Sequence, residues 1–179
     1  MKCVLFSLLS AGMVFLMVSL SFSADRIRTK IIVRVVSKDA KVIGSGVGGA
    51  LVRIKKVETG EVLADGKQEG GTGDTERIMV QPRRRGEGVY GTPGAAFFQA
   101  EIPLSKPTPI EIYTEAPLGY PQAIQRETKT LMLIPGKDIA GEGVVIELHG
   151  LIVNILEPVP AKELPGGKRV TVKAEVRML

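Results

Sequence analysis

The chain has 179 residues, and its 24 Lys and Arg against 19 Asp and Glu give a formal net charge of +5. Mild positive charge with only 4% aromatic residues suits solubility and weak attraction to anionic surfaces, and it does not argue for nucleic-acid binding. One histidine and one cysteine exclude a zinc site that needs several such ligands, and we expect no bound metal or cofactor.

Residues 1–24 are predicted to be a signal peptide. A basic residue precedes an apolar run at residues 4–20, and small residues then allow cleavage after Ser23 or Ala24. Cleavage would direct the protein to a secreted or periplasmic location and leave a net charge of +4. The alternative is a membrane anchor formed by residues 4–22, since about 20 apolar residues span a bilayer.

The remaining chain has the pattern of short strands separated by turns. Glycine and proline recur often, and no segment after the signal peptide has a helical period. Alternation is clearest where Val52 and Ile54 face one way and Arg53 and Lys55 the other. Strands are expected at residues 30–36, 50–57, 62–64, 77–80, 97–104, 109–115, 128–134 and 143–148, and loops at residues 65–73 and 82–94. This spacing predicts an all-β fold, an antiparallel immunoglobulin- or transthyretin-like β-sandwich, for residues 25–149.

Two further strands are expected at residues 150–158 and 169–179. In the second, Val170, Val172, Ala174 and Val176 share one face. Three arrangements remain open for residues 150–179. These strands join the first sandwich, pair with another subunit, or begin a second β-sandwich that continues past the last residue given.

The order of features in residues 30–149 resembles the carboxypeptidase regulatory-like domain, which has a transthyretin-like sandwich. The resemblance rests on Gly-Ala-Leu-Val-Arg-Ile at residues 49–54, the turn at residues 59–61, and the Gly-Tyr pair that ends in Tyr120. The Asp-x-x-Gly element usual in that family is missing near residues 72–75. The resemblance implies an accessory, non-catalytic domain. We expect Tyr120, beside a strand corner, to donate a hydrogen bond to a backbone carbonyl.

The stretch Val-Ile-Gly-Ser-Gly-Val-Gly-Gly-Ala at residues 42–50 contains a formal G-x-G-x-x-G. A dinucleotide site needs a helix directly after these glycines, because the helix N-terminus faces the pyrophosphate. Here a strand pattern follows. The stretch is therefore predicted to be a loop between the first two strands, with no nucleotide.

Arg83, Arg84 and Arg85 form the densest basic cluster and are the candidate ligand-binding residues. Guanidinium groups bind phosphate, sulfate and carboxylate, so an anionic polysaccharide is a possible ligand. The competing interpretation is a solvated surface loop. Only Tyr90 lies nearby, and one aromatic residue does not make a stacking platform for nucleic acid.

Catalytic residues are harder to find in this chain. His149 is expected to be an ordinary strand-end histidine. Glu101, Glu111 and Glu115 are the candidate residues of a carboxylate-based hydrolase, which is the third of three hypotheses for the function. The first is a secreted, non-catalytic structural or binding protein that contacts a protein partner or a cell-surface component. The second is an anion-binding module that uses the arginine cluster.

Overall fold

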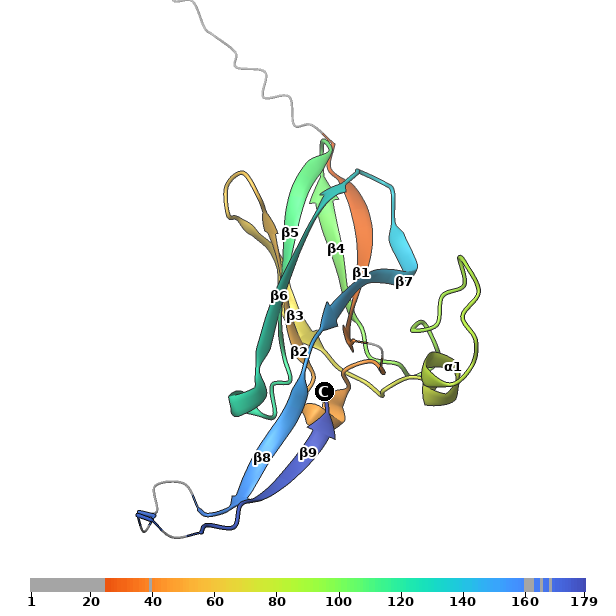
Figure 1. Cartoon of the computed structure of the whole chain (residues 1–179). Coiled ribbons are helices and arrows are strands. Elements are labelled where there is room, and N and C mark those ends of the chain that lie inside the picture. Colours follow the sequence, from red (N-terminus) through yellow and green to blue (C-terminus); the bar gives the residue numbers. More distant parts are fainter. Residues whose placement is uncertain (1–24, 39, 160–162, 165, 168) are drawn as a thin grey trace, which may run out of the picture.

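The computed structural model describes residues 25–38, 40–159, 163–164, 166–167 and 169–179 (Figure 1). The predicted signal peptide lies outside these residues. Within the described part of the chain, no helix is both long and apolar enough to span a membrane.

The described residues are mostly β-strands. The strands are β1 (Ile27–Ser37), β2 (Ala50–Lys56), β3 (Val62–Gln68), β4 (Phe98–Leu104), β5 (Thr108–Ala116), β6 (Gln125–Leu133), β7 (Ile139–Leu148), β8 (Leu151–Glu157) and β9 (Lys173–Met178). One short α-helix, α1 (Thr75–Met79), and two 3₁₀ turns, η1 (Ser45–Val47) and η2 (Pro121–Ala123), lie between them. Most strands expected from the sequence are confirmed, with shifted ends.

Three sheets contain these strands, with the orders β4-β1-β7, β3-β2-β5-β6 and β8-β9. Every pair is antiparallel except β1 with β7, which is parallel. The expectation of a wholly antiparallel fold was therefore wrong. A parallel pair needs a long crossover connection. Here the chain between β1 and β7 contains all four strands of the second sheet, together with β4. This connection is long enough that no crossover helix is required.

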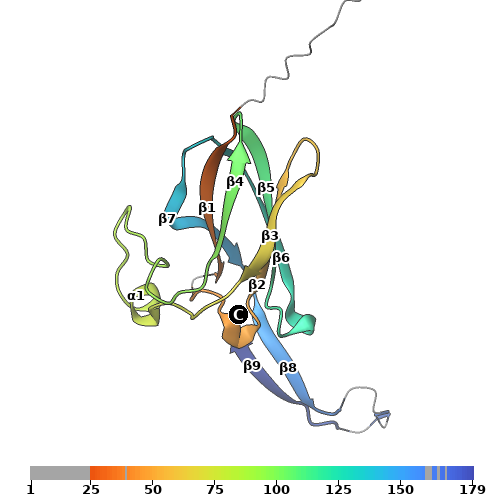
Figure 2. The same ribbon diagram turned by 180° about the vertical axis from the view of Figure 1, so that it is seen from behind.

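The first two sheets face each other and enclose one hydrophobic core (Figures 1 and 2). β2 contributes Val52 and Ile54, both fully buried, and turns Arg53 and Lys55 outward, as its alternation predicts. β5, the neighbour of β2 in the same sheet, repeats the pattern with buried Ile110 and Ile112. Burial of one face of each sheet is the main stabilising interaction of this part of the molecule.

The central strand β1 is buried on both faces, which explains why Ile31, Ile32, Val33, Val35 and Val36 are all apolar, interrupted only by the buried Arg34. Ile31, Val33 and Val35 point into the main core. On the other face, Val36 packs in a second cluster with side chains of the segment between β3 and β4, including Ile78 of α1. That segment packs on the outer face of the sheet near the end of β1, where it also contacts Val145 of β7 (Figure 1).

The strand expected at residues 77–80 is instead the end of α1. Asp74 caps this helix, because its side chain accepts a hydrogen bond of 3.1 Å from the Arg77 N–H. Ile78 is 2% exposed, whereas Val80 is 75% exposed. One buried side chain does not make the alternating pattern of a strand. The N-cap at Asp74 stabilises a helical turn here instead.

The loop expected at residues 65–73 begins later than predicted, because Asp65 to Gln68 continue β3. Gln68 is fully buried. Its Oε1 accepts a hydrogen bond from Val35 N–H (2.7 Å), and its Nε2 donates to Val35 O (2.8 Å) and Ile43 O (2.9 Å). The pairing of β4 with β1 stops at Val33. The Gln68 amide thus takes the place of the missing strand beside β1.

Both C-terminal strands expected from the sequence are present. β8 and β9 pair with each other in a separate two-stranded sheet and with neither larger sheet. Together they form a hairpin that projects away from the two-sheet body (Figures 1 and 2). Among the described residues, β8 and β9 therefore add no strand to either larger sheet.

Candidate functional site

One face of the β8-β9 hairpin is apolar and open to solvent. Strand alternation places three side chains of each strand on this face. We call these six residues the hairpin face: Leu151, Val153 and Ile155 of β8 with Ala174, Val176 and Met178 of β9. Apart from the small Ala174, which is also exposed, their exposed fractions run from 42% to 58%. The predicted shared face of Ala174 and Val176 is confirmed.

The hairpin face is a ladder of three cross-strand rows. Leu151 lies opposite Met178, Val153 opposite Val176, and Ile155 opposite Ala174. The charged side chains of β9, which are Lys173, Glu175 and Arg177, occupy the alternate positions. Of this surface, only Ala174 and Val176 were predicted from the sequence to share a face. The alternate positions of Leu151, Val153 and Ile155 are the signal that would have identified the β8 half.

The opposite side of the hairpin fixes its base to the body. Ile152 and the terminal Leu179 are each 1% exposed and belong to the main core. Arg177 donates a hydrogen bond of 3.1 Å from Nη1 to the Tyr120 hydroxyl. Its hydrogen bond to Glu175 raises the pKa of Arg177. The expected bond from Tyr120 to a backbone carbonyl was wrong, because the hydroxyl of this half-buried tyrosine meets a side chain instead.

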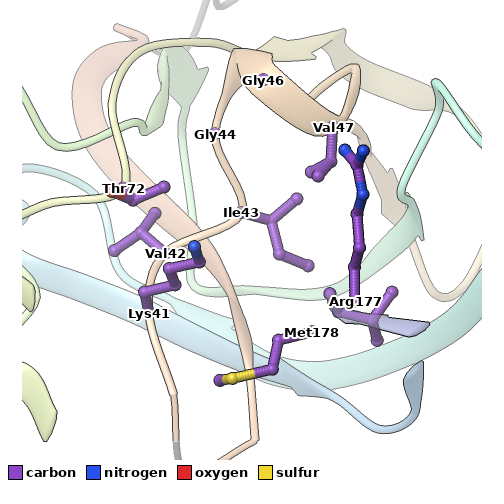
Figure 3. A pocket seen from close by; sticks show the side chains of 10 residues that line it. Lys41, Val42, Ile43, Gly44, Gly46, Val47, Thr72, Arg177 and Met178 are labelled. Carbon is purple, nitrogen blue, oxygen red and sulfur yellow. The ribbon is translucent and has the colours of Figure 1, made fainter. Parts of the chain in front are cut away.

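A cavity of about 420 Å³ lies at the base of the hairpin, between the glycine-rich loop and the end of β9 (Figure 3). Its apolar lining comes mainly from Val42, Ile43 and Val47 on one side and from Met178 on the other. Met178 belongs both to this cavity and to the hairpin face. The two features therefore meet at Met178, and Lys41, Arg177 and Leu179 also line the cavity.

The glycine-rich loop is confirmed as the connection between β1 and β2, with only the single turn η1 inside it. Gly48 has a φ of 90°, and a Cβ added there would lie 2.1 Å from the Gly119 nitrogen. The Gly119 N–H donates a hydrogen bond of 2.9 Å to the Val47 carbonyl. The glycines thus allow two backbone segments to touch. The strand β2 follows directly, so the helix that a dinucleotide site requires is not there.

The arginine cluster is divided by its contacts. Arg83 donates a hydrogen bond of 3.1 Å from Nη2 to the Ile78 carbonyl, and its guanidinium carbon lies 5.5 Å from the centre of the Tyr90 ring. Arg84 does not share these contacts, and it lines a surface pocket together with Arg77. All three arginines are exposed. One member of the cluster therefore supports the fold of its own loop, and anion binding by the cluster stays a prediction.

The glutamates named as hydrolase candidates face outward from two different sheets. Glu101 is on β4, whereas Glu111 and Glu115 are four residues apart on β5. Four residues of strand span about 13 Å, more than the separation of the two carboxylates in most glycosidases. His149 is exposed in the connection between β7 and β8. In the part of the chain that the structure describes, no group of three or more His, Cys, Asp or Glu is placed to hold a metal ion.

Glu115 is held as an anion by its neighbours. It accepts hydrogen bonds from the Tyr113 hydroxyl and from Arg126 Nε, the second at 2.7 Å. Both hydrogen bonds lower the pKa of Glu115, and the bond from Tyr113 has the larger effect. The bond to Glu115 also raises the pKa of Tyr113. A carboxylate paired in this way is a poor general acid, and the trio is best described as a surface polar network.

No protein-family model matches this chain, and searches of curated proteins and of solved structures found no match either.

Proposed function

We propose that this chain is a secreted, non-catalytic binding protein that contacts a protein partner through the hairpin face. The observation that carries the proposal is the exposure of a full apolar ladder on a projecting hairpin. Contiguous apolar patches on a soluble protein mark interaction sites more often than isolated exposed residues do. The transthyretin-like sandwich implied by the sequence would serve as the rigid body that presents this surface.

The strength of the proposed contact follows from the exposed area. Full burial of a Val, Leu, Ile or Met side chain contributes about 1.5–3 kcal/mol. Five such side chains of the hairpin face are close to half exposed, so their burial would contribute about 4–8 kcal/mol. Association itself costs about 4–15 kcal/mol. The face alone therefore supports modest affinity, and a stable complex needs further contacts at the base or tip of the hairpin.

Backbone pairing is one source of such contacts. β8 and β9 pair only with each other among the described strands, so the outer edge of each presents free N–H and C=O groups. A partner strand that adds to either edge would gain main-chain hydrogen bonds while its side chains cover the apolar ladder. This favours a protein partner over a small ligand.

The proposal is tested by photo-crosslinking from the hairpin face. A benzophenone amino acid replaces Val153, which is 46% exposed, in cells that export the full chain. The matched control carries the same group at Val62, which is 50% exposed on β3. We expect a defined protein adduct from position 153 that is absent from position 62. Equal labelling from both positions, or no adduct from either, would contradict the proposal.

A further inference from the structure

We infer that a pocket beside Arg34 of β1 binds a small monocarboxylate ligand whose apolar part packs on Phe97. The pocket has a volume of about 520 Å³ and shares no residue with the hairpin face or with the cavity at the base of the hairpin. Small-molecule sites typically measure about 300–1,000 Å³ and combine apolar side chains with a few polar groups. The inference adds a second site to the molecule and does not depend on the proposed function.

Arg34 carries a buried positive charge that no described carboxylate neutralises through an ion pair. The residue is 6% exposed. Its Nη1 donates hydrogen bonds to the carbonyls of Gly141 (2.6 Å) and Glu142 (2.5 Å), whereas its Nε is buried without an acceptor among the described residues. Buried charges are usually paired, so a guanidinium in this environment favours the binding of an anion.

The Glu142 carboxylate lies near enough to influence Arg34 but is held by other groups. Its Oε1 accepts hydrogen bonds from the N–H groups of Val89 (2.7 Å) and Tyr90 (2.6 Å). Burial lowers the pKa of Arg34, and the charge of Glu142 opposes that effect without cancelling it. Arginine stays protonated in proteins. A ligand carboxylate would therefore meet a full positive charge and would offset the remaining cost of burying it.

Nη2 is the nitrogen of Arg34 that is available to a ligand. It donates to no described group, and Arg34 lines the pocket together with Gly91. A Cβ added to Gly91 would lie 3.8 Å from Nη2, so this nitrogen lies beside Gly91. The backbone N–H groups of Gly91 and Gly94, which also lines the pocket, donate to no described group either. The pocket thus combines one charged donor with backbone donors, a set that suits a carboxylate.

The charges of the lining favour a monocarboxylate over a phosphate. Glu69, the only acidic residue of the lining, is already paired with Lys67 at 3.0 Å. One uncompensated positive charge at Arg34 matches one negative charge, whereas a phosphate dianion would add a second negative charge near Glu69. Phe97 is 43% exposed, and its ring centre lies 5.6 Å from the guanidinium carbon of Arg34. The ring and Pro93 therefore offer an apolar wall to the rest of the ligand.

The first test titrates the isotope-labelled exported chain with sodium benzoate and with sodium hexanoate, and follows the guanidinium signals of Arg34 by NMR. We expect saturable shifts at Arg34 and at the Gly91 amide. Benzamide, which has the same ring without the charge, should bind about tenfold more weakly or less, because charge-assisted hydrogen bonds are the stronger ones. No saturable shift at Arg34 with either carboxylate overturns the site. Tighter binding of inorganic phosphate than of benzoate overturns the monocarboxylate as its ligand.

The second test builds the anion into the chain. A Cβ added to Gly91 meets no atom closer than 3.6 Å, so a side chain fits there. Gly91→Asp places a carboxylate beside Nη2 of Arg34, and Gly91→Asn is the neutral control of the same size. Relative to the control, we expect the aspartate variant to melt about 2–4 °C higher or more, and to lose benzoate binding. Equal melting temperatures of the two variants, or benzoate binding that survives Gly91→Asp, overturn Arg34 as the anion-binding residue. Crosslinking from the hairpin face tests the proposed function separately.

Discussion

Replacement of Gln68 by leucine should be among the most destabilising changes of similar volume in this chain. The Gln68 amide makes three buried hydrogen bonds, two with Val35 and one with Ile43 O. Leucine removes all three. Val35 O keeps the hydrogen bond that it accepts from the Ile43 N–H at 3.0 Å, so Val35 N–H and Ile43 O are the two groups that lose these partners.

The magnitude follows from those two groups. Each buried backbone group without a partner costs about 1–3 kcal/mol, which gives a loss of about 2–6 kcal/mol. The extra apolar surface of leucine offsets about 1–2 kcal/mol. We expect a net loss of about 2–4 kcal/mol, a large share of the 5–15 kcal/mol typical of a domain. The melting temperature should fall by about 5–15 °C for a chain of this length.

Urea unfolding followed by circular dichroism measures this loss directly. The midpoint should move to lower urea while the slope of the transition stays unchanged, because the surface exposed on unfolding is the same. Gln99→Leu on the outer face of β4 is the matched control and should change stability by less than about 0.5 kcal/mol. A Gln68→Leu protein as stable as the control would refute the argument that this amide replaces a strand beside β1.

Three further predictions concern the body of the molecule. Because the folded-state pKa of Glu115 is depressed, its carboxylate contributes stability that is fully present above the pKa of a glutamate in the unfolded chain. That contribution is lost as pH falls through the folded-state pKa, so the stability difference between wild type and Glu115→Gln should vanish in acid titrations. Arg83→Ala should lower the melting temperature, whereas Arg84→Ala should not, which calorimetry distinguishes. Equal effects would contradict the assigned contacts. Gly48→Ala should be strongly destabilising in chemical unfolding, and Gly46→Ala, with open space around it, should be close to neutral.

Local patterns in the sequence are enough to predict much of the fold. Alternation identifies β2 and β5 and the faces that they bury, and the Ala174–Val176 face of β9 is predicted in the same way. This works because the side-chain period of a strand is a property of the backbone and is independent of what covers it. The loop at residues 42–50 is also predictable, since its glycines are followed by a strand and not by a helix.

Other features depend on residues far away in the chain, and only the tertiary structure decides them. The parallel pairing of β1 with β7, the burial of both faces of β1 and the role of Gln68 each join segments that are distant in sequence. The division of the arginine cluster depends on where Tyr90 and α1 lie. The hairpin face shows the same limit. The sequence determines that its side chains point one way, whereas the structure decides that nothing else in the described chain covers them, because burial is a property of neighbours.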